Sequence, residues 1–473
     1  MVDVIELLGG PSPRLTADIP NATPSILVVD ARQDTARLAA YRTLRHHEFV
    51  ARQRLFPRHD TDEWDEHPET IVLTAIDPDG GVLGGVRLHP ELSEIGWWRG
   101  SRLVTTDVSG PPRGIIGRAL VRAACARALD AGALRFDAHV QVAHEVFFTR
   151  LGWETVRPIE IAGEEHRLMR WPVTRLAEHA KAAKASLGPL VGSILPCDRW
   201  RGDDCVPLEG SDLVACVDAI APAMVERDPG WAGWCGMLVT ANDLAAMGAA
   251  PLGALDAAAG RDAAHVASVL RGVRAGSEAF DLPVLGGHTQ LGVPGALSVS
   301  GFGRVAEPVA GGGGSPGDAL WLCADVEGGW RPGYHARQWD STSWRTRDEL
   351  RPMLDVVRRA RPHAAKDASM AGIVGTISML CEASGCGAEL ELDRVPRPAG
   401  AEMADWLSCF PGFALVLAQP VGAPGPRGGG AVSACCGRLT IQSGVRLRWP
   451  DGELTTAIDA STITGLGAVG RAG

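Results

Sequence analysis

The sequence predicts a mixed α/β protein built from an α+β part followed by a longer α/β part. The chain has 473 residues, which is too long for one ordinary hydrophobic core. Strand-like and helix-like segments alternate along it. An Ala/Lys-rich helix that ends in Gly-Pro separates two regions of different composition. We therefore expect domains at 1–175, 190–310 and 317–473, with 176–189 as a helical linker.

Composition narrows the class of protein. Hydrophobic residues make up 45% and charged residues 22%, which is typical of a folded globular chain. A net charge of −10 argues against a general nucleic-acid binder, which needs a basic surface. The start of the chain has no basic, apolar signal pattern, and no apolar run reaches about 18 residues. Eleven cysteines without a CxxC are typical of buried, reduced thiols. We expect a soluble cytoplasmic protein.

The N-terminal part is predicted to be a sheet with a few helices. Apolar residues at helical spacing predict a helix at 41–56, and the turn DPDGG joins two strands into a hairpin. The predicted elements after the first helix are strands at 71–76, 82–89 and 101–106, a helix at 113–133, a strand at 134–140, a short helix at 144–151, and strands from 153 and 166.

The helix at 113–133 begins with the Gly-rich stretch RGIIGRAL, which could hold a diphosphate. The free N–H groups of a first helical turn and the helix dipole favour an anion there. Gly114 and Gly117 allow a close approach of the backbone, and Arg113 and Arg118 could neutralise phosphates. The alternative is a plain helix start with packing glycines.

The segment FFTRLGW at 147–153 combines a helix end, a Gly cap and an aromatic strand start. With the preceding elements, residues 40–171 resemble GNAT-type N-acetyltransferases. The resemblance implies acyl-coenzyme A, such as acetyl-CoA, with its thioester between the strands near 101–106 and 135–140. Its pyrophosphate would lie on the amides of Arg113, Gly114, Ile115, Ile116, Gly117, Arg118 and Ala119. The stretch 44–68 also resembles acyl-homoserine-lactone synthases, which hints at an unusual acceptor pocket.

The resemblance leaves the catalytic groups of this part open. Phe148 stands where a tyrosine often protonates the leaving thiolate. We name Glu94 and His139 as candidate general bases, with Glu91 and His89 as alternatives. For each of them, an ordinary surface residue is the favoured alternative.

The C-terminal part alternates strands and helices. The segment at 237–251 begins as either a strand or a helix and ends with Gly and Pro. The other predicted elements are strands at 213–220, 282–289, 296–305, 319–325, 388–393 and 413–418, and helices at 263–280 and 367–385. The loop GGGGSPG divides this part at 311–317.

Carboxylates from three segments of this part could meet. Asp203 and Asp204 follow a glycine, Asp218 lies in a strand, and Asp243 follows Asn242. Oxygen ligands of this kind suit Mg²⁺ bound to phosphates. Without a metal, each carboxylate–phosphate pair would cost about 4 kcal/mol at 4 Å for an effective dielectric near 20. The alternative is an acidic turn and a helix N-cap, and spacing alone does not decide between them.

Six motifs occur in an order that resembles the aminoimidazole-ribotide-synthetase-related (PurM-like) superfamily. They are GDDC, VDAI, VTANDLAAMGAAP, LGGHT, SPGD and KDASMAGIVGTISMLCEASGCGAELELD, and the resemblance covers 185–473. It implies two α/β halves, a homodimer formed through strands, and ATP bound in a cleft without a P-loop. The GxxxxGK[ST] pattern of a P-loop is indeed absent from the sequence.

The resemblance also implies roles for single residues. Asp203, Asp204, Asp218 and Asp243 would hold Mg²⁺, with Asn242 alongside. Gly286, Gly287 and Thr289 would form the loop near the phosphates, and His288 would face them as a catalytic group. The segment 410–418 has neither the acid nor the tyrosine of thiamine-monophosphate kinases, so thiamine phosphate is not the expected substrate.

The two resemblances together predict a bifunctional enzyme. An acyl-CoA-dependent N-acyltransferase would be joined to a Mg-ATP-dependent enzyme that phosphorylates or activates a small nitrogen-containing, amide-type metabolite. Such fusions resemble the proteins known as nitrogen-starvation N-acetyltransferase and AIR synthase-related. The alternative is an acyl-CoA-binding sensor that gates the ATP-dependent half.

Overall fold

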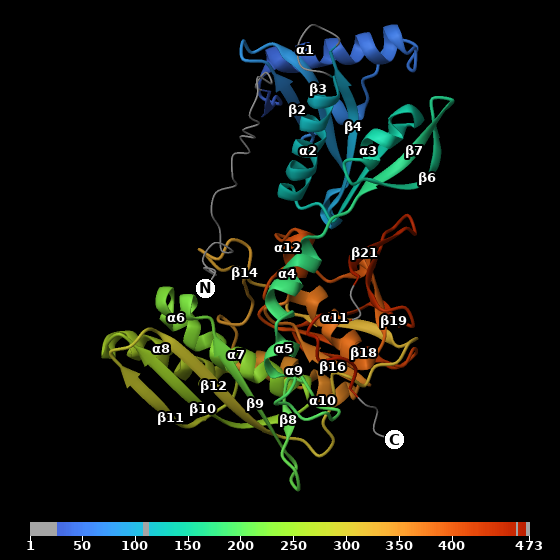
Figure 1. Cartoon of the computed structure of the whole chain (residues 1–473). Coiled ribbons are helices and arrows are strands. Elements are labelled where there is room, and N and C mark those ends of the chain that lie inside the picture. Colours follow the sequence, from blue (N-terminus) through green and yellow to red (C-terminus); the bar gives the residue numbers. More distant parts are fainter. Residues whose placement is uncertain (1–25, 107–112, 460–461, 470–473) are drawn as a thin grey trace. The chain divides into compact units, whose positions relative to one another are not determined.

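The computed structural model describes residues 26–106, 113–459 and 462–469 (Figure 1). The chain forms two compact units. The first unit runs to Val173 and includes Glu402–Ala404, and the second unit contains Thr174–Ala401 and the chain from Asp405 on.

The first unit is a seven-stranded sheet of order β1-β2-β3-β4-β5-β7-β6. Its strands are β1 (Leu27–Asp30), β2 (Ile71–Ile76), β3 (Val82–Leu92), β4 (Trp97–Thr105), β5 (Arg135–Gln141), β6 (Glu154–Ile161) and β7 (Glu164–Trp171). Its helices are α1 (Thr35–Arg45), the π-helix η2 (His46–Arg52), α2 (Arg113–Asp130) and α3 (Glu145–Thr149), with short turns η3 (Glu63–Asp65), η4 (Ser93–Ile95) and η5 (Val142–His144).

Strands β4 and β5 form the parallel pair of this sheet and separate along their length. They pair only from Trp97 opposite Arg135 to Gly100 opposite Ala138, although both continue beyond that point. Helices cover both faces of the sheet. A Cβ at Gly84 would meet Leu120 of α2, and a Cβ at the next residue, Gly85, would meet Tyr41 of α1. The gap between β4 and β5 is therefore flanked by α2 on one face and by α1 and η2 on the other.

A buried network of ion pairs fixes η2 and the loop that follows it. Arg45 is fully buried and contacts Asp60 at 2.6 Å and Asp65 at 2.5 Å. Arg87 of β3 contacts Asp65 at 2.8 Å and Asp62 at 2.5 Å. Because each guanidinium meets carboxylates in a fixed geometry, the network ties the loop to the sheet.

The second unit contains two main sheets. The five-stranded sheet has the order β11-β10-β12-β9-β8, and the seven-stranded sheet has the order β16-β18-β13-β19-β17-β20-β21. The first is formed by β8 (Val206–Pro207), β9 (Leu213–Ile220), β10 (Ala250–Gly260), β11 (Val284–Leu291) and β12 (Ala296–Arg304). The second is formed by β13 (Ala319–Ala324), β16 (Ala364–Asp367), β17 (Gly387–Glu391), β18 (Ala414–Gln419), β19 (Val432–Thr440), β20 (Gly444–Arg448) and β21 (Leu454–Ile458), and β14 (Gly329–Trp330) pairs with β15 (Trp339–Asp340).

Helix α7 (Pro229–Ala246) lies at the centre of this unit and is buried over most of its length. It packs on β9 and β12 of one sheet and on β16 of the other. The segment at 237–251, left open between strand and helix, is therefore the end of a buried helix followed by β10. The remaining helices are α4 (Arg175–Lys184), α5 (Leu187–Val191), α6 (Pro222–Arg227), α8 (Ala263–Ala279), α9 (Arg347–Leu354), α10 (Val356–Ala360), α11 (Gly372–Ser384), η6 (Leu392–Arg394) and α12 (Met403–Ser408).

The predicted linker at 176–189 is helical, but it packs as part of the second unit. Leu176 and Ala180 of α4 are buried. A Cβ added to Gly375 of α11 would lie 3.3 Å from the Ala180 side chain, so the two helices approach closely. The segment is thus a packed element rather than a free connection.

Two further features concern the whole described chain. All eleven cysteines are free thiols, and most of them are buried. Among the described helices, none is both long enough and apolar enough to cross a membrane.

The buried network predicts a large stability effect at Arg45. Arg45→Met removes a buried guanidinium from Asp60 and Asp65, of which Asp65 keeps its contact with Arg87, so we expect the first unit to lose about 3 kcal/mol. Arg42→Met is the control, because Arg42 forms an exposed pair with Glu66 whose loss costs about 1 kcal/mol or less. Urea denaturation of the full chain, followed by tryptophan fluorescence, measures both. Equal midpoint shifts for the two variants would contradict the prediction.

Candidate functional site

Three carboxylates meet in the interior of the second unit. Asp204 precedes β8, Asp243 lies in α7, and Asp367 ends β16. One oxygen from each lies within 4.8 Å of the others. Three hard oxygen donors at this spacing can hold a divalent cation such as Mg²⁺.

Lys366 and a backbone N–H group hold the side chain of Asp204. Lys366 Nζ lies 2.6 Å from one oxygen of Asp204, and the N–H of Asp367 donates to the other at 3.1 Å. Asp203 faces another way, because it accepts from the N–H of Gly311 at 2.8 Å and lies 3.3 Å from Lys366. Asp203 therefore braces the turn, and Asp204 reaches the cluster.

Asp218 extends the cluster along β9. Its carboxyl lies near that of Asp243 and interacts with it. Among the described residues, one oxygen of Asp218 and one of Asp367 are buried without a hydrogen-bond partner. Buried polar atoms of this kind call for a ligand, water or ion.

The electrostatics of the cluster favour a bound cation. Burial, followed by repulsion from neighbouring carboxylates, raises the pKa of Asp243 and of Asp367 well above the usual range. Burial opposes the charge of Lys366, but Asp204 and Asp203 outweigh it and raise the lysine pKa. One lysine cannot balance this many carboxylates. A divalent cation would compensate the excess charge, so the donor set fits Mg²⁺.

Lys184 brings a second positive charge toward the cluster from the end of α4. Burial is the main cause of the raised pKa of Asp218 and of Asp367, and the charge of Lys184 partly offsets it in both. The segment predicted as a linker thus contributes to the electrostatics of this site.

The structure modifies the predicted set of ligands. Asp204, Asp218 and Asp243 come together as expected, and Asp203 lies beside them in a bracing position. Asp367 and Lys366 were missed, although the motif KDASMAGIVG begins with them. That motif pointed only to a resemblance, and its acid was not among the predicted donors.

Asn242, which was predicted to lie alongside the cluster, is fully buried in α7. Its side-chain N–H donates to the carbonyl of Gly412 at 2.9 Å and so links α7 to the loop before β18. Among the described residues, its side-chain oxygen is buried without a hydrogen-bond partner, as are the oxygens of Asp218 and Asp367.

The predicted phosphate loop is remote from the carboxylates within one chain. Gly286, Gly287, His288 and Thr289 lie in β11, an exposed edge strand. The register places Gly287 three strands from Asp218, through Asp256 and Val299, which is about 14 Å at the usual strand spacing. The structure therefore does not bring His288 to the carboxylate cluster.

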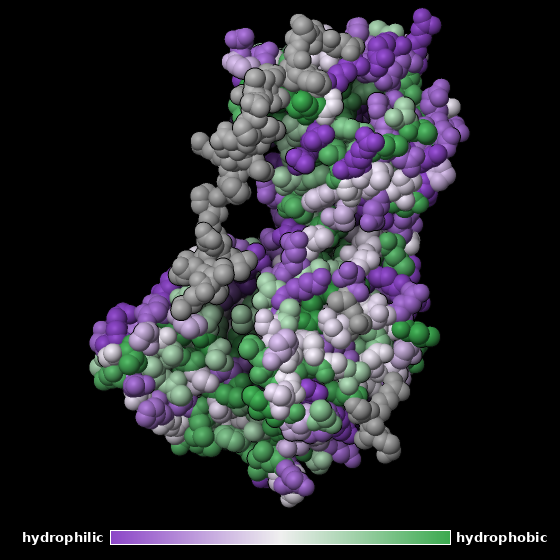
Figure 2. Space-filling model, viewed as in Figure 1, coloured by the Kyte–Doolittle hydropathy of each residue, from purple (hydrophilic) through white to green (hydrophobic). Residues whose placement is uncertain are grey.

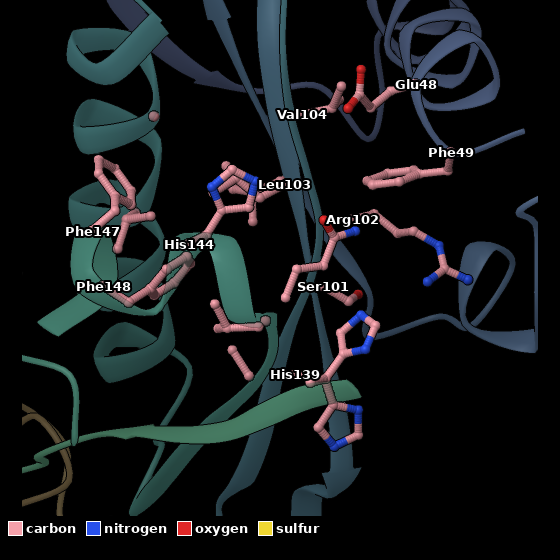
Figure 3. Close-up of a pocket in the computed structure, with 18 of the residues that line it drawn as sticks. Glu48, Phe49, Ser101, Arg102, Leu103, Val104, His139, His144, Phe147 and Phe148 are labelled. Carbon is pink, nitrogen blue, oxygen red and sulfur yellow. The ribbon is translucent and has the colours of Figure 1, made fainter. Parts of the chain in front are cut away.

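A cavity of about 410 Å³ lies in the first unit, where β4 and β5 diverge. Figure 3 shows Phe147 and Phe148 on the side of α2, and Glu48 and Phe49 on the other side of β4. The cavity is large enough for part of a small-molecule ligand.

Three of the seven predicted cofactor-binding residues line this cavity. They are Arg113, Gly114 and Gly117 at the start of α2. The other four do not line it: Ile116 is buried in the core, Arg118 is exposed, and Ile115 and Ala119 are partly buried. Residues 107–112, which precede the helix, lie outside the described residues.

The π-helix η2 supplies the opposite wall. Glu48, Phe49 and Arg52 come from its seven residues and line the cavity. Its wider turn is a form often found at functional sites. A hydrogen bond from Arg52, opposed by burial, lowers the pKa of Glu48, so this wall carries a fixed ion pair. Sequence periodicity predicted a helix here but could not reveal its π form.

Only one of the candidate bases lines the cavity. His139 of β5 does so, and burial with the nearby charge of Arg99 lowers its pKa to about 4. Glu94 is exposed in η4, and neither it nor Glu91 lines the cavity. The prediction of Glu94 as a base therefore lacks the geometry that it needs.

His89 is also outside the cavity lining, in a buried stack. Its ring lies 4.5 Å from that of Trp64 at 17°, and burial lowers its pKa to about 3. It is a packed core histidine.

Phe148, which stands where the resemblance implies a tyrosine, packs among aromatic side chains. Phe148 is buried and meets Trp153 edge to face, with ring centroids 5.3 Å apart. Tyr41 donates its hydroxyl to the carbonyl of Arg102 at 2.8 Å, and burial raises its pKa to about 12. This tyrosine therefore supports β4 and is a poor acid for a leaving thiolate.

Comparison with known proteins places the second unit in a family. The AIR synthase related protein N-terminal domain matches residues 202–305, and the C-terminal domain of the same protein matches residues 315–423. An uncharacterised protein of Synechocystis sp., sll0787, is 34% identical over 224 residues, which are 46% of this chain and 69% of that protein.

Two further proteins are similar to part of the chain. The thiamine-monophosphate kinase of Caulobacter vibrioides is 31% identical over 184 residues, which are 36% of this chain and 51% of the kinase. The crystal structure of tt0281 from Thermus thermophilus is 26% identical and has a TM-score of 0.44, covering 57% of this chain and 96% of that one. The chain thus spans about half to two thirds of the curated relatives it matches. Through residues 202–423, the chain belongs to the AIR synthase related protein family.

Proposed function

We propose that the second unit binds Mg·ATP and phosphorylates or activates a small nitrogen-containing, amide-type metabolite. The observation that carries the proposal is the meeting of Asp204, Asp243 and Asp367 beside Lys366. The similarity to a thiamine-monophosphate kinase supports an ATP-dependent reaction. The substrate differs in our proposal, because the segment 410–418 lacks the acid and the tyrosine expected for thiamine phosphate.

The residues of the cluster have distinct tasks in this proposal. Asp204, Asp243 and Asp367 would hold Mg²⁺, with Asp218 next to Asp243. A bound ion would supply positive charge against phosphate groups that the carboxylates alone would repel. Lys366 keeps Asp204 in its orientation. In the reaction, the amide oxygen attacks the γ-phosphorus, ADP leaves, and a nucleophile then displaces the phosphate.

A second function is favoured by the cavity of the first unit. We infer an acyl-CoA-dependent N-acyltransferase, because the cavity lies between diverging parallel strands and reaches the start of α2. Arg113, Gly114 and Gly117 are placed to meet a phosphate-bearing arm. The amine nitrogen forms the new C–N bond, its proton passes to His139, and the CoA thiolate leaves. The amide formed is the type of group that the second unit would activate.

Phe148 favours one alternative for the first unit. Without a hydroxyl at this position, the unit could bind acyl-CoA as a sensor that gates the ATP-dependent reaction. Calorimetry with acetyl-CoA, combined with a transfer assay over a set of amines, separates the two functions. Binding with transfer supports the acyltransferase, and binding without transfer supports the sensor.

We further infer that the second unit forms a homodimer through the open face of its five-stranded sheet. Val217 of β9 and Leu255 of β10 are both paired with Ser300 of β12, which lies between them. Val217 is 66% exposed and Leu255 is 40% exposed. Asp218 lies in the next row and faces the opposite side, where α7 packs. Figure 2 shows hydrophobic residues on the surface formed by these strands. An apolar sheet face of this kind suits a second copy.

Removal of one carboxylate should weaken Mg·ATP binding strongly. Asp243→Asn is expected to weaken it by about 100-fold or more. The pKa of Asp243 is higher in the folded chain than in the unfolded chain, where it is about 4. The protonated carboxyl therefore contributes stability below about pH 4, and this contribution is lost as the pH rises through the folded-state pKa. The metal-free variant should therefore melt above the wild type at about pH 8. Calorimetry and thermal melting of the full chain measure the two effects.

The matched control for this prediction is Asp212→Asn. Asp212 forms an exposed pair with Arg304, so its loss should leave both Mg·ATP binding and melting nearly unchanged. If Asp243→Asn binds Mg·ATP as tightly as the control variant, the cluster is not the metal site.

The low pKa of His139 predicts an unusual pH profile for acyl transfer. The neutral ring is the base form and is present above about pH 4, so kcat/KM should lose this group's contribution only as the pH approaches about 4. His139→Gln should lower kcat/KM on the order of 100-fold, whereas His47→Gln on the exposed side of η2 should not. A fall in kcat/KM near pH 6.5 that is absent from the His139→Gln variant would contradict the low pKa of His139.

The dimer proposal predicts a monomer when a charge enters the open sheet face. Val217→Glu should weaken association by about 2 kcal/mol or more, because the carboxylate would be buried unpaired. Ile441→Glu introduces the same charge at another exposed apolar residue and should leave the dimer intact. Sedimentation velocity at several protein concentrations measures both variants. A wild-type monomer at high concentration would refute the proposal.

A further inference from the structure

We propose that the cavity of the first unit accepts acyl groups much longer than acetyl, namely unbranched chains of medium length. The inference rests on the proposed acyl-CoA function and names the acyl class of the same site. The walls of the cavity, their division into a polar and an apolar part, and the cavity volume support it.

The point where β4 and β5 separate fixes the position of the thioester. The last paired residues are Gly100 and Ala138, and the strands diverge beyond them. Gly100 has no side chain, and a Cβ there would lie 3.2 Å from the ring of Phe136. A side chain at Gly100 would therefore crowd Phe136, and we place the thioester here because the strands separate at this point.

An apolar chamber lies on the α2 side of this point. Gly117, Val121 and Ala124 are four and three residues apart, so they form one stripe along α2 that spans roughly 10 Å. The opposite wall consists of Phe136, Phe148 and Trp153, which are 1%, 8% and 3% exposed. Gly117 lies against the ring of Phe147, which would be 3.3 Å from a Cβ at this position. The small side chain of Ala124, farther along the helix, leaves more room in the cavity than a longer one would.

Polar groups lie at other parts of the cavity. Glu48 and Arg52 come from η2, on the other side of β4, and Arg113 lies at the start of α2. They suit a polar acceptor and a phosphate-bearing arm, respectively. Figure 3 also shows one polar ring, His144, beside Phe147 and Phe148 on the α2 side of the cavity. The six lining residues named above are apolar, so an apolar chain is the ligand that matches this part of the wall.

The volume is larger than an acetyl group needs. Protein cores are close-packed and leave few voids larger than a water molecule. A cavity of about 150 Å³ with apolar walls already takes benzene, and the cavity here has about 410 Å³. The single methyl of an acetyl group would leave the chamber along α2 unfilled, whereas a chain of several methylenes would bury its surface there.

The test uses a series of saturated CoA thioesters, from acetyl through butyryl and hexanoyl to octanoyl. Binding to the full-length protein is measured by isothermal titration calorimetry, with free CoA as the reference. Each methylene that enters the chamber should tighten binding about fourfold. We expect hexanoyl-CoA to bind more tightly than acetyl-CoA by about 100-fold or more.

A pair of variants assigns this gain to the chamber. Ala124→Leu fills the space between α2 and Trp153, so the gain should stop at a shorter chain while acetyl-CoA still binds. Ala126→Leu makes the same change on the exposed side of the same helix and should leave the whole series unchanged. Thermal melting of both variants establishes that each is folded.

The outcomes separate this inference from the proposed function. If acetyl-CoA binds as tightly as hexanoyl-CoA, the acyl class is short, and the acyl-CoA function still stands. An unchanged series in folded Ala124→Leu overturns the placement of the chain along α2. If no thioester of any length binds, the acyl-CoA function fails and the inference fails with it.

Discussion

The second unit is organised around buried negative charge that its own residues do not neutralise. Five carboxylates gather around Lys366, and burial raises the pKa of four of them, Asp203, Asp218, Asp243 and Asp367. Such a cluster opposes folding unless something positive binds to it. The buried α7, the brace from Asp203 to Gly311 and the strand β16 all hold it in place. The stability of the unit and its proposed ligand are therefore linked through one site.

The first unit has a different constraint, which is a sheet that opens in the middle. The parallel strands β4 and β5 would complete a continuous sheet if they stayed paired, but they separate after Gly100. The buried ion pairs of Arg45 and Arg87 fix the loop that follows η2, and η2 itself lines the cavity at this opening.

Many of the helices and strands could be predicted from the sequence, and the elements and residues that were missed were missed for physical reasons. Strand and helix periodicity located most elements, including β9 and α8, because one face of each is apolar. The four residues of β1 are too few for periodicity to detect, and a π-helix has the same composition as an α-helix. The Asp cluster was largely predicted, since its motifs are distinctive. Asp367 was missed because its neighbour in space, Asp204, lies 163 residues away in the chain.

The packing of α4 has a consequence for how the chain can be divided. Gene fission or proteolysis at the Gly-Pro after residue 187 would look harmless in the sequence, because the composition there is typical of a loop. Such a cut would expose the buried faces of Leu176 and Ala180 and remove Lys184 from the neighbourhood of the acids. A freestanding second half must therefore begin at or before Thr174. Helix α4 therefore belongs with the acid site in any such division.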